Sequence, residues 1–239
     1  MVVENDGVRN TASDLTTNGH GRMPLAMLVG LSAVVLFWRV GERPLLDWEE
    51  ARYAQVAREM LTSGNWVDLS WNNAPYFNKP PLLFWAIALS FQTFGESEWA
   101  VRLPGVLCGI GSVGLVYMLG QQLYGRVSGL GASCLLLSLY PFLTHGSRQC
   151  APDALLLFWS LLALLAFWRG QQDARWRVIV GIALGAGALT KGIAAVIPLL
   201  VIVSFCAWQQ QLQVLRTRWF LFGTGLTLWT LTSRDMRVL

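Results

Sequence analysis

Apolar residues run in long blocks along most of this chain, and short polar breaks separate the blocks. Although several blocks are short, they approach the ~20 apolar residues that a helix needs to cross a membrane. The expected spans are 24–40, 100–120, 127–143, 154–168, 178–190 and 193–208, with a further candidate at 219–232. The pattern predicts an all-α integral membrane protein built as a multi-span helix bundle.

Residues 41–98, between the first two expected spans, are both charged and aromatic. Apolar residues recur there at helical spacing from Asp47 to a cluster of helix breakers at 62–65, which predicts an amphipathic helix. A second apolar stretch, Pro80–Phe94, is short for a span and begins with two prolines. We expect it to lie at the membrane surface without crossing, as a juxtamembrane helix of an outer loop between the first two spans.

The arginines favour one orientation in the membrane. The polar breaks at 121–126, 169–177 and 209–218 carry several arginines against the single acid Asp173. Because cytoplasmic loops are enriched in basic residues, these breaks are expected in the cytoplasm. The loop at 41–98 then faces the outside.

The composition supports a membrane protein and excludes several other classes. The chain is 54% hydrophobic and 13% charged, so a soluble core of this length could not hide its apolar surface. The net charge of +4 comes from arginines between apolar blocks and indicates topology, with no nucleic-acid partner. The polar residues 1–22 are expected to form a disordered cytoplasmic tail, and 23–239 the transmembrane domain.

Three acidic residues, Asp47, Glu49 and Glu50, open the predicted amphipathic helix. Asp47 and Glu50 have the spacing of an N-cap residue and its capping-box partner, which is a purely structural explanation. That explanation does not use Glu49. A chemical role for this carboxylate therefore stays open.

Lysine is rare in this chain, because only Lys79 and Lys191 occur among 18 basic residues. Each lies where an apolar block meets a loop on the expected outer face. A compact ammonium at that depth suits a lipid phosphate, and simple anchoring at the interface is the alternative. Asp153 follows Pro152, so it could cap the next helix or act in a site.

Four motifs follow one another along the chain: DWEEARYAQVAREMLTSGNW, PYFNKPPL, APDALLLFW and ALTKG. Together they resemble the successive motifs of the polyprenol-phosphate-sugar-dependent membrane glycosyltransferases of the GT-C superfamily. That superfamily includes the aminoarabinose transferases that modify lipid A and the protein O-mannosyltransferases. The resemblance covers about residues 43–200 and implies a multi-helix enzyme whose active site faces away from the cytoplasm.

The resemblance also implies roles for particular residues. Glu49 matches the family's aspartate, the catalytic base, with Asp47 close enough to substitute or assist, and Asp153 matches a second active-site acid. Glutamate in place of aspartate is a departure that shifts the carboxylate by one methylene. The donor phosphate would be bound by Lys79, Arg52 and Lys191, and the sugar and prenyl cavity would be lined by Tyr53 and Tyr76.

The expected partners are a polyprenyl-phosphate sugar and membrane lipid, and the acceptor stays open. Aminoarabinose transferases often carry a glutamate, linked to metal binding, where this chain has Asn78. We therefore expect no metal site and no cofactor.

These observations predict a hexosyl or pentosyl membrane glycosyltransferase. It would move a sugar from a polyprenyl-phosphate donor to a lipid, glycan or protein acceptor on the periplasmic or extracytoplasmic face of the inner or plasma membrane. Family members carry about twice as many spans, so the chain is expected to be their N-terminal portion, and its activity alone is open. The alternative is a non-catalytic membrane protein, transporter-like or a scaffold, that retains the fold.

Overall fold

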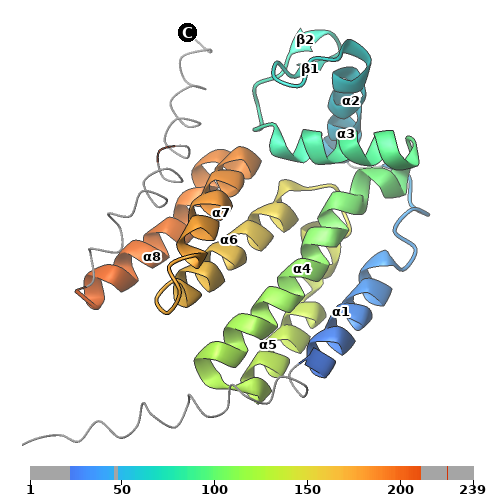
Figure 1. Ribbon diagram of the computed structural model, residues 1–239. Coiled ribbons are helices and arrows are strands. Elements are labelled where there is room, and N and C mark those ends of the chain that lie inside the picture. Colours follow the sequence, from blue (N-terminus) through green and yellow to red (C-terminus); the bar gives the residue numbers. More distant parts are fainter. Residues whose placement is uncertain (1–21, 46–47, 211–224, 226–239) are drawn as a thin grey trace, which may run out of the picture.

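The computed structural model describes residues 22–45, 48–210 and 225, which are helical for most of their length (Figure 1). The main helices are α1 (Arg22–Phe37), α2 (Trp48–Ser63), α3 (Leu82–Phe94), α4 (Glu98–Tyr124), α5 (Arg126–Ser138), α6 (Pro152–Arg169), α7 (Trp176–Lys191) and α8 (Val196–Trp208). A π-helical turn, η2 (Phe142–Gly146), and a 3-10 turn, η3 (Gly192–Ala195), join some of them. Two short antiparallel strands, β1 (Ser70–Trp71) and β2 (Ala74–Pro75), form a hairpin with Ser70 opposite Pro75.

Among the described residues, three helical stretches are long and apolar enough to cross a membrane: Glu98–Tyr124, Pro152–Arg169 and Trp176–Trp208. Shorter apolar helices cover Met23–Phe37, Leu82–Phe94 and Arg126–Ser138. The prediction of a multi-span helical membrane protein is confirmed.

The long stretch Trp176–Trp208 is a pair of helices, because the chain reverses at Gly192. That residue has φ 56°, a left-handed conformation that glycine adopts without strain. After the reversal, Phe205 near the end of α8 lies beside Phe167 near the end of α6, with ring centroids 5.8 Å apart. The separate blocks expected at 178–190 and 193–208 therefore correspond to α7 and α8.

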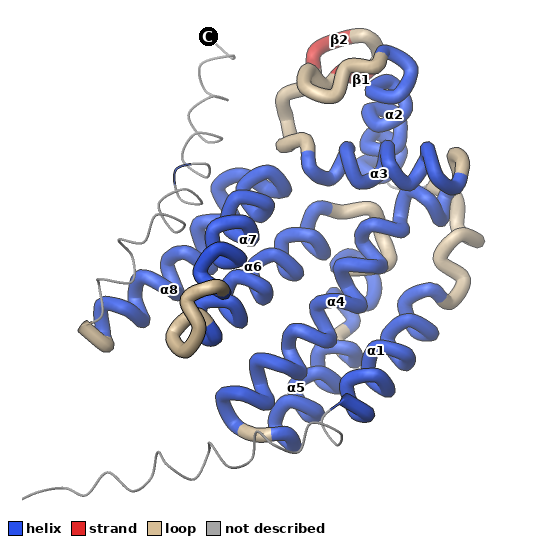
Figure 2. Tube along the Cα trace, in the orientation of Figure 1, coloured by secondary structure: helices blue, strands red, loops and turns tan. Residues whose placement is uncertain are grey.

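Two groups of helices make up the bundle, each with its own apolar core. One core joins α1, α4 and α5 around Leu36, Val113 and Tyr117, and the other joins α6, α7 and α8 around Ala166, Leu184 and Ile202. Figure 2 shows that loops are confined to the ends of the helices.

Helix α3 lies across one end of the bundle, and α2 and the hairpin lie beyond it (Figure 1). Buried aromatic contacts hold these elements together, with the ring of Phe84 at 5.6 Å from Tyr53 and at 5.8 Å from Tyr76. The same core cluster includes Ala154 of α6. The helix predicted within Pro80–Phe94 is thus present as α3 and lies across the end of the bundle. That it does not cross the membrane stays a prediction.

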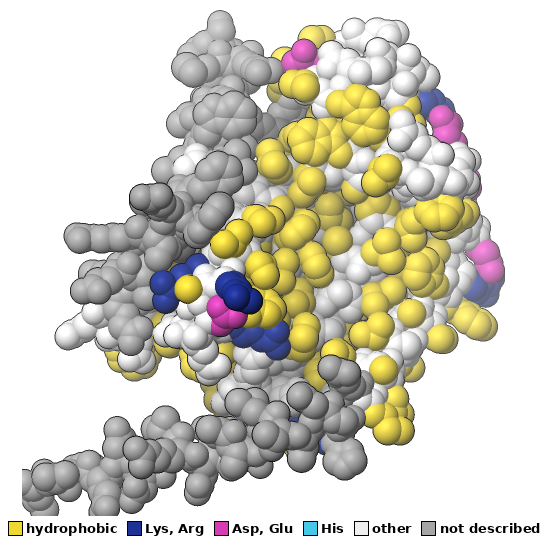
Figure 3. Space-filling model, in the orientation of Figure 1, with side chains coloured by type: hydrophobic (Ala, Val, Ile, Leu, Met, Phe, Trp, Pro, Cys, Tyr) yellow, Lys and Arg dark blue, Asp and Glu magenta, His cyan; other side chains and the backbone are white. Residues whose placement is uncertain are grey.

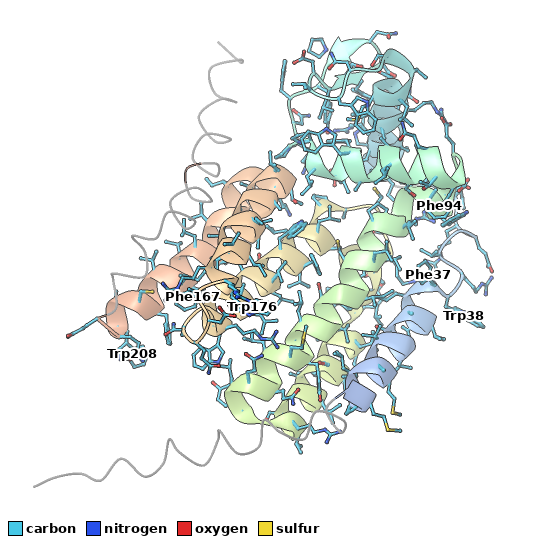
Figure 4. All side chains as sticks on the ribbon, in the orientation of Figure 1. Phe37, Trp38, Phe94, Phe167, Trp176 and Trp208 are labelled. Atoms are coloured by element: carbon cyan, nitrogen blue, oxygen red, sulfur yellow. The ribbon has the colours of Figure 1, made fainter. Side chains whose placement is uncertain are left out.

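Aromatic side chains mark both ends of the bundle. Figure 4 places Phe94 at the α3 end and Phe167 and Trp176 near the turn between α6 and α7. Trp38 and Trp208 are 66% and 84% exposed. Figure 3 shows hydrophobic side chains spread over the visible face and basic side chains gathered over the α6–α7 turn. This distribution is typical of a membrane protein with aromatic belts and a basic face.

The structure corrects one sequence-based prediction and adds a contact to another. The block at 127–143 is not one helix, because α5 ends at Ser138 and Leu139 is extended (ψ 120°). Pro141 contributes to the break, since it lacks the N–H that would bond to the carbonyl of Leu137 in a continuous helix. Glu50, suggested as a capping-box partner of Asp47, is 3% exposed and paired with Arg102.

Some predictions fall outside the described residues. These are the tail at 1–21, the acid Asp47 and, apart from residue 225, the candidate span at 219–232.

Candidate active site

Glu49 and Lys79 face one another at the junction of α2 and the loop that leads into α3. Glu49 lies in the first turn of α2, and Lys79 immediately precedes Pro80. The Lys79 Nζ lies 3.9 Å from the Glu49 Oε1, with the side chains 28% and 51% exposed. This is a loose ion pair, since a charge-assisted hydrogen bond would bring the atoms to about 2.8 Å.

Of the two predicted cavity residues, Tyr53 lies next to Glu49. Tyr53 and Tyr76 are buried in the core cluster under α2, where both pack on Phe84. Burial, followed by the nearby Glu49 carboxylate, raises the pKa of the Tyr53 hydroxyl well above its ordinary value. Tyr53 therefore stays neutral beside Glu49 and adds no second negative charge.

Asp153 and Lys191 form a second carboxylate–lysine pair. Asp153 is in the first turn of α6 and Lys191 is the last residue of α7, and the Lys191 Nζ donates to the Asp153 Oδ1 at 2.5 Å. The N-cap position of α6 is Ala151, so Asp153 does not cap this helix. Its carboxylate instead points to a cation 38 residues away in sequence.

Arg52 is placed differently from the two lysines. Its guanidinium lies 5.0 Å from the ring centroid of Trp48 and 5.2 Å from that of Trp71. These distances are typical of cation–π contacts. The two indoles hold Arg52 one helical turn after Glu49, on the same helix.

Both carboxylate–lysine pairs lie at the α3 end of the bundle, opposite the arginine-rich α6–α7 turn (Figure 1). Glu49 and Asp153 are also connected through their neighbours. Glu50 accepts a hydrogen bond from the backbone N–H of Cys150, in the segment that leads into α6. The structure therefore forms two pairs at one end, Glu49–Lys79 and Asp153–Lys191.

The buried Glu50–Arg102 pair next to this site was not predicted from the sequence. A signal was present, because Arg102 is an arginine inside the apolar block 100–120. A charge at that position is costly unless an opposite charge accompanies it. The opposite charge is Glu50, which lies 52 positions away in the sequence, so local sequence patterns do not reveal the pair.

Metal ligands are not gathered at this site in the part of the chain that the structure describes. No group of three or more His, Cys, Asp or Glu side chains there is arranged to hold a metal ion. Asn78, next to Lys79, is exposed.

Residues 78–233 match the family described as dolichyl-phosphate-mannose-protein mannosyltransferase. The matched region covers more than half of the chain and includes Lys79, Asp153 and Lys191. The chain belongs to this family. Its membership agrees with the resemblance inferred from the motifs.

Curated relatives of this mannosyltransferase-family chain include bacterial arabinosyl transferases. The chain is 31% identical over 198 residues to the undecaprenyl phosphate-alpha-4-amino-4-deoxy-L-arabinose arabinosyl transferase 2 of Pseudomonas fluorescens (strain Pf0-1), covering 80% of this chain and 36% of that protein. It is 34% identical over 194 residues to the corresponding transferase of Pseudomonas savastanoi pv. phaseolicola, covering 78% and 36%. The chain thus spans about a third of the length of these relatives.

Solved structures show the same arrangement of helices. The crystal structure of ArnT from Cupriavidus metallidurans bound to undecaprenyl phosphate superposes with a TM-score of 0.75 at 27% identity, covering 90% of this chain and 41% of that one. The Archaeoglobus fulgidus oligosaccharyltransferase in the apo form gives a TM-score of 0.68 at 15% identity, covering 93% and 33%. The second likeness concerns the fold alone.

Proposed function

We propose that this chain carries the donor-binding and catalytic residues of a membrane glycosyltransferase that uses a polyprenyl-phosphate sugar. The observation that carries the proposal is the pairing of two carboxylates with the two lysines of the chain at one end of an apolar bundle. The relatives named above support it, since they are arabinosyl transferases named for an undecaprenyl phosphate-linked sugar.

Lys79 is the proposed ligand of the donor phosphate. Its 3.9 Å separation from Glu49 is too long for a strong hydrogen bond, so little energy is lost when a phosphate oxygen replaces the carboxylate. Lys191 is bound more tightly by Asp153 and would supply positive charge at longer range. Together the ammoniums stabilise the negative charge that develops on the leaving phosphate.

Glu49 is the proposed general base. In the reaction, the acceptor hydroxyl oxygen bonds to the anomeric carbon, the bond from that carbon to the phosphate oxygen breaks, and the hydroxyl proton moves to a carboxylate. Half of the Glu49 side chain is exposed, and it lies beside the proposed phosphate ligand. Asp153 is the second proposed acid of the site, and it orients the Lys191 ammonium.

The proposed active face is the outer one, periplasmic in a bacterial inner membrane. Arg126, Arg169, Arg175 and Arg177 lie at the ends of α5, α6 and α7 remote from α3, which favours the cytoplasm for that end. The donor lipid would then be met at the level of α3. We propose a lipid acceptor of the lipid A type, by analogy with the aminoarabinose transferases.

Transfer in membranes tests the proposal. Membranes that contain the protein are incubated with undecaprenyl phosphate carrying radiolabelled 4-amino-4-deoxy-L-arabinose, with lipid A as acceptor. We expect label in lipid A, a loss of at least about 100-fold in the Glu49→Gln variant, and unchanged binding of undecaprenyl phosphate by that variant. Lys79→Ala should weaken this binding by about tenfold or more.

Two results would contradict the proposal. Binding of undecaprenyl phosphate without transfer to any lipid, glycan or protein would favour the non-catalytic carrier or scaffold. Equal activity of Glu49→Gln and the parent protein would remove Glu49 from the chemistry.

A further inference from the structure

Arg102 lies inside the apolar helix α4 near its first turn, yet only 4% of it is exposed. Its Nε and Nη2 donate to the two carboxylate oxygens of Glu50 at 3.0 and 2.8 Å. Its remaining contacts are to the backbone carbonyls of Val40 at 2.7 Å, Arg43 at 2.8 Å and Pro44 at 3.2 Å. One guanidinium thus ties α4 to the start of α2 and to the connector that precedes it.

Glu50 extends this connection toward α6. Its Oε1 also accepts a hydrogen bond from the backbone N–H of Cys150 at 2.6 Å. Cys150 belongs to the segment that leads directly into α6 and Asp153, and Glu50 follows Glu49 in the chain. A single buried carboxylate therefore lies between the backbones that carry the two candidate acids.

The segment before α6 is also fixed from its other side. A Cβ at Gly109 of α4 would lie 2.6 Å from the Oγ and 2.7 Å from the Cβ of Ser147, which is fully buried. At Gly105, a Cβ would come within 3.3 Å of the Ser147 carbonyl oxygen. Since only glycine allows this approach, the segment is held between α4 and Glu50 with little room to move.

We propose that Glu50 and Arg102 are a positioning pair, which fixes the Glu49 carboxylate of α2 relative to the Asp153 carboxylate of α6. Neither residue of the pair is exposed enough to touch substrate. The catalytic part of this inference rests on the proposed function, whereas its structural part does not. A shift of about 1 Å in a reacting group can lower a rate by about 100-fold. A change in the relative position of the Glu49 and Asp153 carboxylates should therefore lower kcat.

The chain contains a matched control pair. Arg58 of α2 and Glu96, just before α4, join nearly the same two helices, with Nη2 and Oε2 2.6 Å apart. Their side chains are 51% and 44% exposed. This pair has the same chemistry as Glu50–Arg102 but is about half exposed. Within the described part of the chain, its hydrogen bonds join only Arg58, Glu96 and Gln55.

The experiment compares three variants of the protein in membranes and in detergent: Arg102→Met, the double variant Glu50→Gln/Arg102→Met, and Arg58→Met. Arg102→Met leaves a buried charge without its partner and should lower the thermal midpoint most. The double variant removes both charges and keeps an acceptor for the Cys150 N–H, so its midpoint should return toward that of the parent. Its kcat should nevertheless stay about 100-fold low with KM unchanged, because the contacts to the connector before α2 are gone.

Hydrogen–deuterium exchange provides a readout that does not need activity. Peptides over 40–50 and 147–152 should exchange faster in the double variant than in the parent and in Arg58→Met. If the double variant recovered both the thermal midpoint and kcat, the pair would only stabilise the fold. Unchanged exchange in both peptides would overturn the positioning role. A parent protein that makes no product would count against the proposed function alone, since the exchange data still decide whether the pair fixes the two segments.

Discussion

Glu49 and Glu50 are neighbours in the first turn of one helix, yet they lie in opposite environments. Glu50 points inward, is 3% exposed and is bound by Arg102 and by the Cys150 backbone. Glu49 points outward and meets Lys79 at 3.9 Å. The difference separates two neighbouring carboxylates: Glu50 is bonded within the protein, while Glu49 is half exposed to solvent.

Loss of the buried Glu50–Arg102 pair should have the largest effect on stability. Glu50→Ala leaves the Arg102 guanidinium buried without a counter-charge and should lower the free energy of unfolding by about 3–5 kcal/mol. The free energy of unfolding is measured in mixed detergent micelles. Glu96→Ala, which opens the exposed pair with Arg58, should cost no more than about 1 kcal/mol. Equal losses would mean that burial does not separate the two pairs.

Close packing beside the interior pair gives the next largest effect. Gly109→Ala would push its new methyl group into the buried Ser147 side chain, so we expect a loss of about 1–3 kcal/mol. The control is Gly131→Ala in α5, where a Cβ would meet nothing within 4 Å. That variant should be neutral or slightly stabilised, because alanine favours helix more than glycine does. The same unfolding assay distinguishes them.

Glu59, a partly buried carboxylate of α2, should have an intermediate effect on stability. Burial alone would raise the pKa of Glu59, but hydrogen bonds from Ser70, Gln55 and the backbones of Asn72 and Asn73 lower the pKa below its ordinary value. The resulting stabilisation of the hairpin is present above the unfolded carboxyl pKa of about 4.3 and is lost as the pH falls through the lower folded pKa.

Glu59→Gln should therefore cost roughly 0.5–1 kcal/mol at pH 7, because the site is partly solvated. Tryptophan fluorescence of the hairpin should change with pH below about 4 in the parent protein. In the variant this change should be absent, and a transition that survives there would assign it to another acid.

Loss of the exposed Asp153–Lys191 pair should have the smallest effect on stability. Asp153→Asn opens a pair whose side chains are 54% and 34% exposed, so the free energy of unfolding should change by less than about 1 kcal/mol. Transfer of sugar to lipid should nevertheless fall by about 100-fold or more if this acid acts in the site. Asp173→Asn, in the α6–α7 turn at the opposite end, is the matched control and should leave transfer unchanged.

Local patterns predicted the helices well and the contacts between them poorly. The helix over 48–63 and the surface helix Leu82–Phe94 followed from apolar spacing and breakers, which act within a few residues. The hairpin was missed although Asn72 and Asn73, both at positive φ, are residues that suit a tight two-residue turn. The break before Pro141 was missed because hydrophobicity alone defined that block.

The candidate site was predictable where a residue was unusual for its surroundings. Lys79, Lys191 and Asp153 stood out as rare charges at the edges of apolar blocks, and the structure pairs both lysines with acids. Which acid each lysine meets could not be read from sequence, because partners 30 to 38 residues apart are chosen by how the helices pack. Arg102 and Glu50 needed the same long-range information.

The Asp153–Lys191 pair is built from opposite ends of two antiparallel helices. Asp153 lies at the N-terminus of α6, where the helix macrodipole is positive, and Lys191 lies at the C-terminus of α7, where it is negative. Each helix end favours the charge that it carries, by about 0.3–1 kcal/mol at partly exposed positions. Each helix end therefore stabilises the charge that it carries whether the pair is closed or open. A charged substrate that entered between the two side chains would leave this contribution of the helix ends in place.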